Sequence, residues 1–276
     1  MSRNVMTVRL AQDVGMPLIG EYARRFGVYD SLPNYLAYSL GAGETTVMRM
    51  VTAYSMFANG GRRIQPTLID RIQDRYGKTI YRHDQRECRG CDAKQWSNQP
   101  EPTLVDHQEL VLDPMTAYQM TSMLQGVVQR GTGTALRAVG KPVAGKTGTT
   151  NDEKDVWFVG FTPEIAVGVY LGYDKPRHLG RDATGGHLSA PIAKDFFKAA
   201  LADKPAMPFR VPTGIKLIPV DHKTGQRAGP GTQNRILEAF KPGTAPPENN
   251  AVAMGGYEGG TVTPEADGAV RRGGLY

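Results

Sequence analysis

The segment from residue 142 to residue 172 sets the tightest limit on the fold. Residues 156–161 and 165–172 are two apolar runs separated by Thr162-Pro163-Glu164, a spacing that predicts an antiparallel pair of strands. A third run, residues 142–145, leads into this pair and predicts a further strand. We therefore expect an antiparallel sheet in the second half of the chain.

Helical spacing of apolar residues marks four segments: 5–26, 46–58, 114–131 and 191–201. Gly15-Met16-Pro17 interrupts the first segment, and Asp113 supplies a good N-cap for the third. In the fourth segment we expect Phe196, Phe197 and Leu201 to face the core. Helices come first, strands follow and one helix closes the series, which favours an α+β fold over alternating α/β.

Between the second and third helices, the sequence predicts a hairpin and then a loop. Residues 64–72 and 79–81 flank a turn at residues 75–78, whereas residues 83–108 lack periodicity and are interpreted as an exposed loop. This loop holds both cysteines, as Cys88-x-x-Cys91. Three interpretations stay open: a local disulfide in an oxidising compartment, a zinc site that needs two more ligands, or plain loop cysteines.

Charge and hydropathy exclude several classes of function. The 276 residues carry a net charge of +6, but the densest basic groups are three arginine pairs without a recognised module or an aromatic platform. We therefore expect no binding of nucleic acid. No run of 18 apolar residues exists, so the sequence predicts no transmembrane helix, and its first residues do not form a signal peptide.

Composition divides the later part of the chain. Residues 204–240 hold one short apolar run and a turn, which predicts a small appendage to a body formed by residues 1–203. Residues 241–276 contain 8 glycines and 4 prolines among 36 residues, with little apolar surface to bury. We expect this tail to be disordered.

The string Lys146-Thr147-Gly148-Thr149-Thr150 continues the first predicted strand. A lone Lys-Thr-Gly is a weak signal, and the chain contains a second copy, Lys223-Thr224-Gly225, which we interpret as a hairpin turn. Residues 151–163 give the first copy a context that the second lacks. Over about residues 2–203 the chain resembles class A penicillin-binding proteins of the 1A type, a similarity carried by this stretch, by residues 40–44 and 53–61, by Gly131-Thr132-Gly133-Thr134-Ala135 and by Gly185-Gly186 before Ala190-Pro191.

The resemblance implies a serine β-lactamase/penicillin-binding-protein-like transpeptidase fold with three motifs, Ser-x-x-Lys, Ser-x-Asn and Lys-Thr-Gly. Ser2-Arg3-Asn4 resembles the second motif, and Lys146-Thr147-Gly148 resembles the third. None of the seven serines has a lysine three positions later, so the nucleophile motif is absent. We therefore expect residues 1–203 to be a partial transpeptidase domain, incomplete at the N-terminus and inactive by itself.

The resemblance also implies the role of each site residue. A serine outside the chain would attack the D-Ala-D-Ala amide of a peptidoglycan stem peptide, with Ser2, Asn4 and Lys146 as the catalytic residues present here. Thr147, Gly148 and Thr149 would bind the substrate through two hydroxyls, a close backbone approach and one N–H of the oxyanion hole. The chemistry needs no cofactor and no metal.

The expected partners are peptidoglycan stem peptides, β-lactam antibiotics and the cell-wall elongation machinery. For the full-length parent, the resemblance implies a glycosyltransferase part upstream and a location at the periplasmic face of the inner membrane. Two alternatives stay open: a D,D-carboxypeptidase or β-lactamase-like hydrolase on the same scaffold, and a non-enzymatic binding domain that retains the fold.

Overall fold

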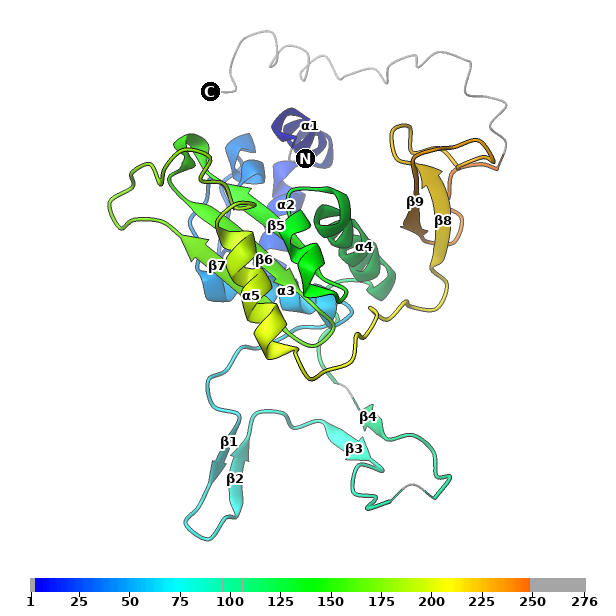
Figure 1. Ribbon diagram of the computed structural model, residues 1–276. Helices are drawn as coiled ribbons and strands as arrows, with labels where there is room; N and C mark the ends of the chain where they lie inside the picture. The colour runs from blue at the N-terminus through cyan, green and yellow to red at the C-terminus, as the bar shows by residue number, and fades with distance from the viewer. Residues whose placement is uncertain (1–2, 96, 106, 249–276) are drawn as a thin grey trace.

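A three-stranded antiparallel sheet lies at the centre of the body in the computed structural model, which describes residues 3–95, 97–105 and 107–248 (Figure 1). Its strands are β5 (Ala144–Thr149), β6 (Val156–Phe161) and β7 (Ala166–Leu171), in that order. The register pairs Thr147 with Phe158 and Phe158 with Val169. All three predicted strands are confirmed, and β5 is an edge strand because it pairs with β6 alone among the described strands.

One face of this sheet is covered by α5 (Ser189–Ala200) and the 3₁₀-helix η2 (Thr134–Val139). Phe158 packs there against Phe197 and Leu201, and all three are almost fully buried. The expectation that Phe196 faces the core is wrong, since its side chain is 46% exposed. Adjacent residues on a helix point in directions about 100° apart, so Phe196 and Phe197 cannot both face the sheet.

Two further helices, α3 (Val47–Ala58) and α4 (Pro114–Arg130), pack against the sheet strands. Leu124 of α4 lies in a cluster with Ala144 and Phe161, against which Tyr54 of α3 packs. Both helices begin with a side-chain cap, because Thr46 accepts a hydrogen bond from the Arg49 N–H and Asp113 accepts one from the Thr116 N–H. The predicted helices 46–58 and 114–131 are confirmed.

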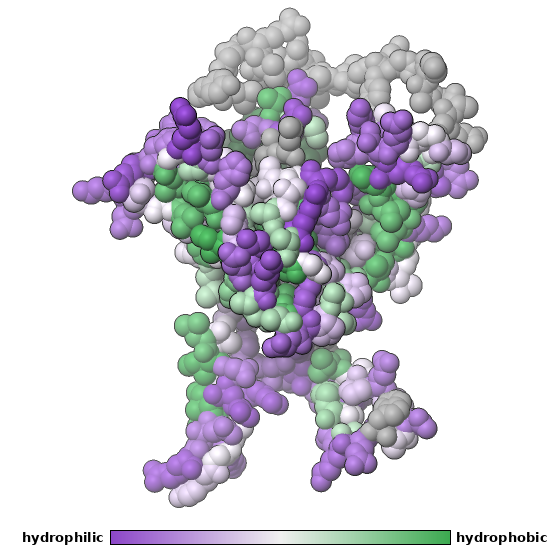
Figure 2. Space-filling view, in the orientation of Figure 1, coloured by the Kyte–Doolittle hydropathy of each residue, from purple (hydrophilic) through white to green (hydrophobic). Residues whose placement is uncertain are grey.

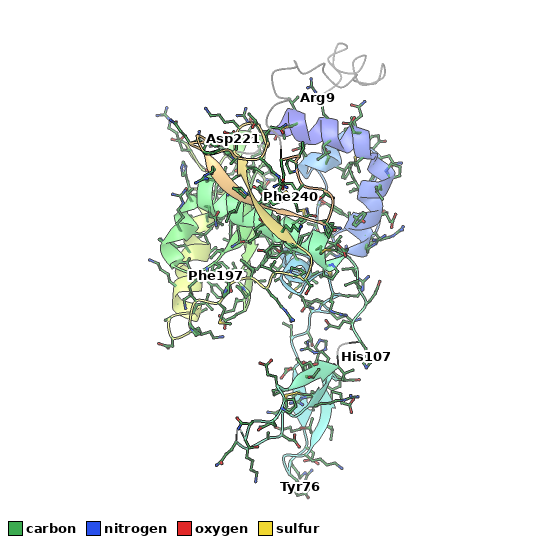
Figure 3. The ribbon with its side chains drawn as sticks, turned by 90° about the vertical axis from the view of Figure 1, so that its right-hand side faces the viewer. Arg9, Tyr76, His107, Phe197, Asp221 and Phe240 are labelled. Atoms are coloured by element: carbon green, nitrogen blue, oxygen red, sulfur yellow. A yellow bond between two sulfur atoms is a disulfide. The ribbon has the colours of Figure 1, made fainter. Side chains whose placement is uncertain are left out.

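The first helical segment is split, as predicted, into α1 (Asn4–Val14) and α2 (Met16–Arg25), with the short η1 (Leu36–Leu40) after them. Gly15 joins the two helices at a φ of 89°, in the region that favours glycine. Figure 3 places α1, which carries Arg9, at the end of the molecule opposite Tyr76. No helix of the described residues is long and apolar enough to cross a membrane.

Two hairpins project from the body between α3 and α4 (Figure 1). Strands β1 (Arg71–Gln73) and β2 (Thr79–Arg82) form the predicted hairpin, but its first strand is shorter than expected. Figure 2 shows hydrophobic surface on the projecting part of the molecule. Leu68, in the segment before β1, is 93% exposed, and Ile80 of β2 is 64% exposed.

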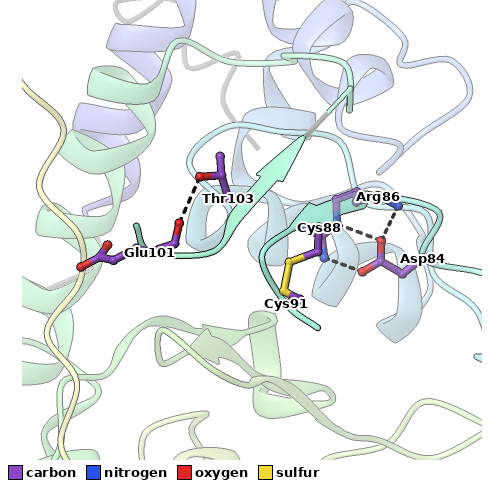
Figure 4. The surroundings of a disulfide bond; sticks show 6 residues. All are labelled: Asp84, Arg86, Cys88, Cys91, Glu101 and Thr103. Atoms are coloured by element: carbon purple, nitrogen blue, oxygen red, sulfur yellow. Dashed lines mark hydrogen bonds and ion pairs between the residues drawn. A yellow bond between two sulfur atoms is a disulfide. The ribbon is translucent and has the colours of Figure 1, made fainter. Parts of the chain in front are cut away.

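The second hairpin corrects the prediction of a loop over residues 83–108. It consists of β3 (Glu87–Arg89) and β4 (Thr103–Val105), which pair Cys88 with Leu104. Each strand has three residues, too few for a period-2 pattern to stand out in the sequence. Cys88 and Cys91 are joined by a disulfide beside the Arg86–Asp84 ion pair of 2.6 Å (Figure 4). Of the three interpretations of the cysteines, the structure contains the local disulfide.

After α5, strands β8 (Lys216–Asp221) and β9 (Arg235–Phe240) form a separate antiparallel pair. The pair packs along α4, where Gln119 Nε2 donates to the Ala239 carbonyl at 2.9 Å and Arg130 pairs with Glu238 at 2.8 Å. The second Lys-Thr-Gly lies in the turn after β8, as predicted, with the Asp221 carboxylate accepting from the Thr224 N–H. The end of the expected disordered tail, residues 249–276, lies outside the described residues.

Candidate functional site

Strand β5 carries Lys146, Thr147, Gly148 and Thr149 at the edge of the sheet. Side chains of a strand alternate between its two faces, so Lys146 lies on the face opposite Thr147 and Thr149. Lys146 is half-buried, and its Nζ donates to the Thr147 carbonyl at 2.6 Å. Burial lowers the pKa of Lys146 below its ordinary value of 10.5, because a poorly solvated ammonium is harder to keep charged. The site therefore contains a partly desolvated cation.

Thr147 is held from outside the sheet by a residue distant in sequence. Its side chain is buried, at 7% exposure, and its Oγ1 lies 2.5 Å from Thr132 Oγ1 in the turn between α4 and η2. Thr132 itself is exposed. The two hydroxyls therefore form a pair whose outer member reaches solvent.

Thr149 is held in a similar way by the segment before α5. Its Oγ1 accepts a hydrogen bond from the Gly185 N–H at 3.1 Å. Gly185 is buried so close to the sheet that a Cβ placed on it would lie 2.4 Å from the carbonyl oxygens of Gly148 and Trp157. The neighbouring Gly186 also closely approaches Thr132, since a Cβ there would lie 2.7 Å from the Thr132 carbonyl oxygen. Only residues without a side chain fit this contact.

The connection from β5 to β6 is closed by hydrogen bonds across its base. It contains η3 (Asn151–Glu153), and three hydrogen bonds join Thr150 to Asp155. The Thr150 N–H donates to the Asp155 carbonyl at 3.0 Å, the Asp155 N–H donates to Thr150 Oγ1 at 2.8 Å, and the Thr150 hydroxyl donates to the Asp155 carbonyl at 3.3 Å. Tyr170 of β7 donates its hydroxyl to Asp155 Oδ1 at 2.7 Å, which raises the pKa of Tyr170. Asp155 therefore has a structural partner within the sheet.

The remaining predicted residues belong to the N-terminal helix. Asn4 is the first residue of α1 and is exposed, while Ser2 lies outside the described residues. The proximity of Asn4 to Lys146 and the role of Ser2 therefore stay predictions. The described residues contain no cluster of His, Cys, Asp and Glu that could hold a metal ion.

Two residues at this site were not selected from the sequence. Thr132 and Gly185 each belong to strings that carried the family resemblance, but neither string indicated a contact with β5. The neighbouring glycines, Gly131, Gly133 and Gly186, could have indicated a contact here, because glycine permits close approach of two backbones. Sequence alone does not say which backbone they approach.

Comparison with known proteins agrees with the geometry. A family profile described as "Penicillin binding protein transpeptidase domain" matches residues 1–198. Penicillin-binding protein 1A of Rickettsia conorii is 47% identical over 243 residues, covering 87% of this chain and 30% of that protein. The corresponding protein of Pseudomonas aeruginosa is 35% identical over 97% of this chain and 36% of its own length. The chain thus spans about a third of these relatives.

The same similarity extends to solved structures. The crystal structure of penicillin-binding protein 1A from Haemophilus influenzae superposes on 90% of this chain, and on 40% of that chain, with a TM-score of 0.74 and 26% sequence identity. The α+β fold with its antiparallel sheet, expected from the order of the elements, is therefore the fold of these relatives.

Proposed function

Because the chain belongs to the transpeptidase family of class A penicillin-binding proteins of the 1A type, we propose that it is part of a peptidoglycan D,D-transpeptidase. Such an enzyme cross-links stem peptides by transferring an acyl group from a D-Ala-D-Ala donor, through a serine ester, to an amine of a neighbouring strand. The observation that carries the proposal is the Lys146-Thr147-Gly148-Thr149 string on an edge strand of the sheet.

Lys146 is proposed to attract the terminal carboxylate of the donor. Opposite unit charges 4 Å apart gain about 4 kcal/mol at an effective dielectric constant of 20, before the cost of desolvation is subtracted. The partial burial of Lys146 supports this role, because the attraction grows as water is excluded. The absence of a side chain at Gly148 allows a peptide to approach the strand edge.

The threonines are proposed to give the donor its directional hydrogen bonds at the edge of β5. Thr147 and Thr149 would donate hydroxyl protons to the same carboxylate, and the Thr149 N–H would serve as one donor of the oxyanion hole. Their fixed partners, Thr132 and Gly185, support this role, since a donor that is already oriented loses little entropy on binding. Ser2 would pass a proton toward the leaving amine, and Asn4 would bind the backbone of the substrate.

The remaining parts of the proposal concern the whole protein. β-Lactams would act as donor mimics that leave a slow acyl-enzyme. The full-length parent would sit at the periplasmic face of the inner membrane and work with the cell-wall elongation machinery. The disulfide of Cys88 and Cys91 supports that location, because disulfides persist in oxidising compartments.

Labelling with a fluorescent penicillin tests the proposal. We expect no covalent label on the 276-residue chain, and label once an upstream segment carrying Ser-x-x-Lys is joined to it. In that longer protein, Lys146→Ala should lower the rate of labelling about 10- to 100-fold, the loss typical of one hydrogen bond to a charged group.

The second Lys-Thr-Gly supplies a matched control. Lys223→Ala removes the same side chain from the same tripeptide in the turn after β8, and the labelling rate should not change. An equal fall in both variants would contradict the role of Lys146. Label on the isolated chain would contradict the expectation that the nucleophile lies elsewhere.

A further inference from the structure

The hydroxyl pair of Thr132 and Thr147 has a simple consequence for its protons. Two hydroxyl groups carry two protons, and the 2.5 Å contact between their oxygens uses one of them. Whichever threonine donates, one O–H of the pair remains for another acceptor. Thr147 of β5 is buried and Thr132 is exposed, so the pair has one buried hydroxyl and one hydroxyl at the surface.

The position of Thr132 is fixed by its neighbours on both sides. The N–H groups of Gly131 and Gly133 both donate to the Val127 carbonyl at 3.1 Å, which holds the turn against the end of α4. On the other side, Gly186 lies so near that a Cβ would come within 2.7 Å of the Thr132 carbonyl oxygen. The turn therefore contacts the end of α4 on one side and the segment that precedes α5 on the other.

We propose that Thr132 is a specificity-determining positioning residue of the transpeptidase site: its O–H donates to Thr147 Oγ1 and so aims the remaining O–H, that of Thr147, at the terminal carboxylate of the donor. This inference rests on the proposed function, because it takes the edge of β5 as the place where that carboxylate binds. Donors with a free carboxylate gain this hydrogen bond, whereas donors in which the carboxylate is esterified lose the charge that strengthens it.

The measurement that tests this role is the preference of the enzyme for a donor with a free carboxylate over its ester. A general disturbance of the fold would slow the reaction with both donors alike and leave this preference unchanged. In the longer protein with an upstream Ser-x-x-Lys, the initial rate of acylation is measured with a penicillin and with its methyl ester. Thr132→Val keeps the shape of the side chain and removes the hydroxyl. We expect it to lower the ratio of acid to ester rates by about 2- to 12-fold, the range of one hydrogen bond.

Three further variants make the result interpretable. Thr132→Ser restores a hydroxyl and should return the ratio to the wild-type value. Thr134→Val makes the same change at the exposed first residue of η2, two positions along the chain, and should leave the ratio unchanged. Thr132→Ala gives the same readout if valine disturbs the fold.

Each outcome decides a separate question. An unchanged ratio in Thr132→Val, including equal losses of rate with acid and ester, would overturn the role of Thr132. The proposed function would still stand in that case if the wild-type protein is labelled by penicillin. A wild-type longer protein that takes up no penicillin would overturn the proposed function and this inference with it.

Discussion

Gly185 offers the sharpest test of how strand β5 is supported by the segment that precedes α5. The residue is buried against β5 and β6, donates its N–H to Thr149 and accepts from the Ala190 N–H at 2.8 Å. In Gly185→Ala, the new Cβ would stand 2.4 Å from two carbonyl oxygens, those of Gly148 and Trp157. Carbon and oxygen atoms in close contact normally lie about 3.3 Å apart, so each carbonyl would have to retreat by about 0.9 Å.

The loss of folding stability in Gly185→Ala depends on how easily the two carbonyl groups can move. Both carbonyls belong to backbone of paired strands, which cannot swing aside as the end of a flexible side chain can. Overpacking of this kind typically costs about 1–3 kcal/mol, and for a domain of this size each kcal/mol lowers Tm by about 2–4 °C. A displacement of about 1 Å at β5, the strand proposed to bind the donor, can also slow acylation about 100-fold.

Thermal unfolding and penicillin labelling of the longer protein measure the two effects. We expect Gly185→Ala to lower Tm by roughly 2–12 °C and to slow labelling more than the loss of stability explains. Gly231→Ala is the matched control, because no atom lies within 4 Å of the Cβ it would add and its φ is not in the left-handed region. Wild-type Tm and wild-type labelling in Gly185→Ala would refute the close approach that the structure describes.

The remaining predictions concern charge, capping and the disulfide. The rate of penicillin labelling should fall as pH rises through the lowered pKa of Lys146, so the fall should begin below pH 10.5. The free energy of unfolding should rise over the same pH range, because the unfolded chain holds the Lys146 proton more tightly than the folded chain does. Lys146→Arg should abolish both effects, because arginine stays charged throughout this range. Asp113→Ala should cost about 0.5–2 kcal/mol in urea unfolding near neutral pH, and the difference from wild type should shrink as pH falls through the pKa of Asp113, which its hydrogen bond from Lys241 lowers most. Replacing Cys88 and Cys91 by serine should loosen the β3–β4 hairpin by about 2 kcal/mol, seen as faster amide exchange there, and should leave penicillin labelling unchanged.

The elements that the sequence predicted well have strong local signals. The strands β6 and β7 are unbroken apolar runs around a proline turn, and α4 has its cap at Asp113 and a long apolar stripe behind it. The β3–β4 hairpin was missed because its strands have three residues each and are held by pairing across a loop, which no local pattern records. Phe196 was misassigned because two adjacent aromatic residues on a helix leave open which of them faces the core.

The sequence by itself determined the order of helices and strands, the family, and the string on the first strand of the sheet. These depend on periodicity, caps and motifs, which are properties of neighbouring residues. Only the tertiary structure decided that Thr132 meets Thr147 and that Gly185 meets Thr149, 15 and 36 residues apart in the chain. A hydrogen bond exists only when two atoms lie within about 3 Å of each other, and for distant segments that distance is set by how helices pack on the sheet.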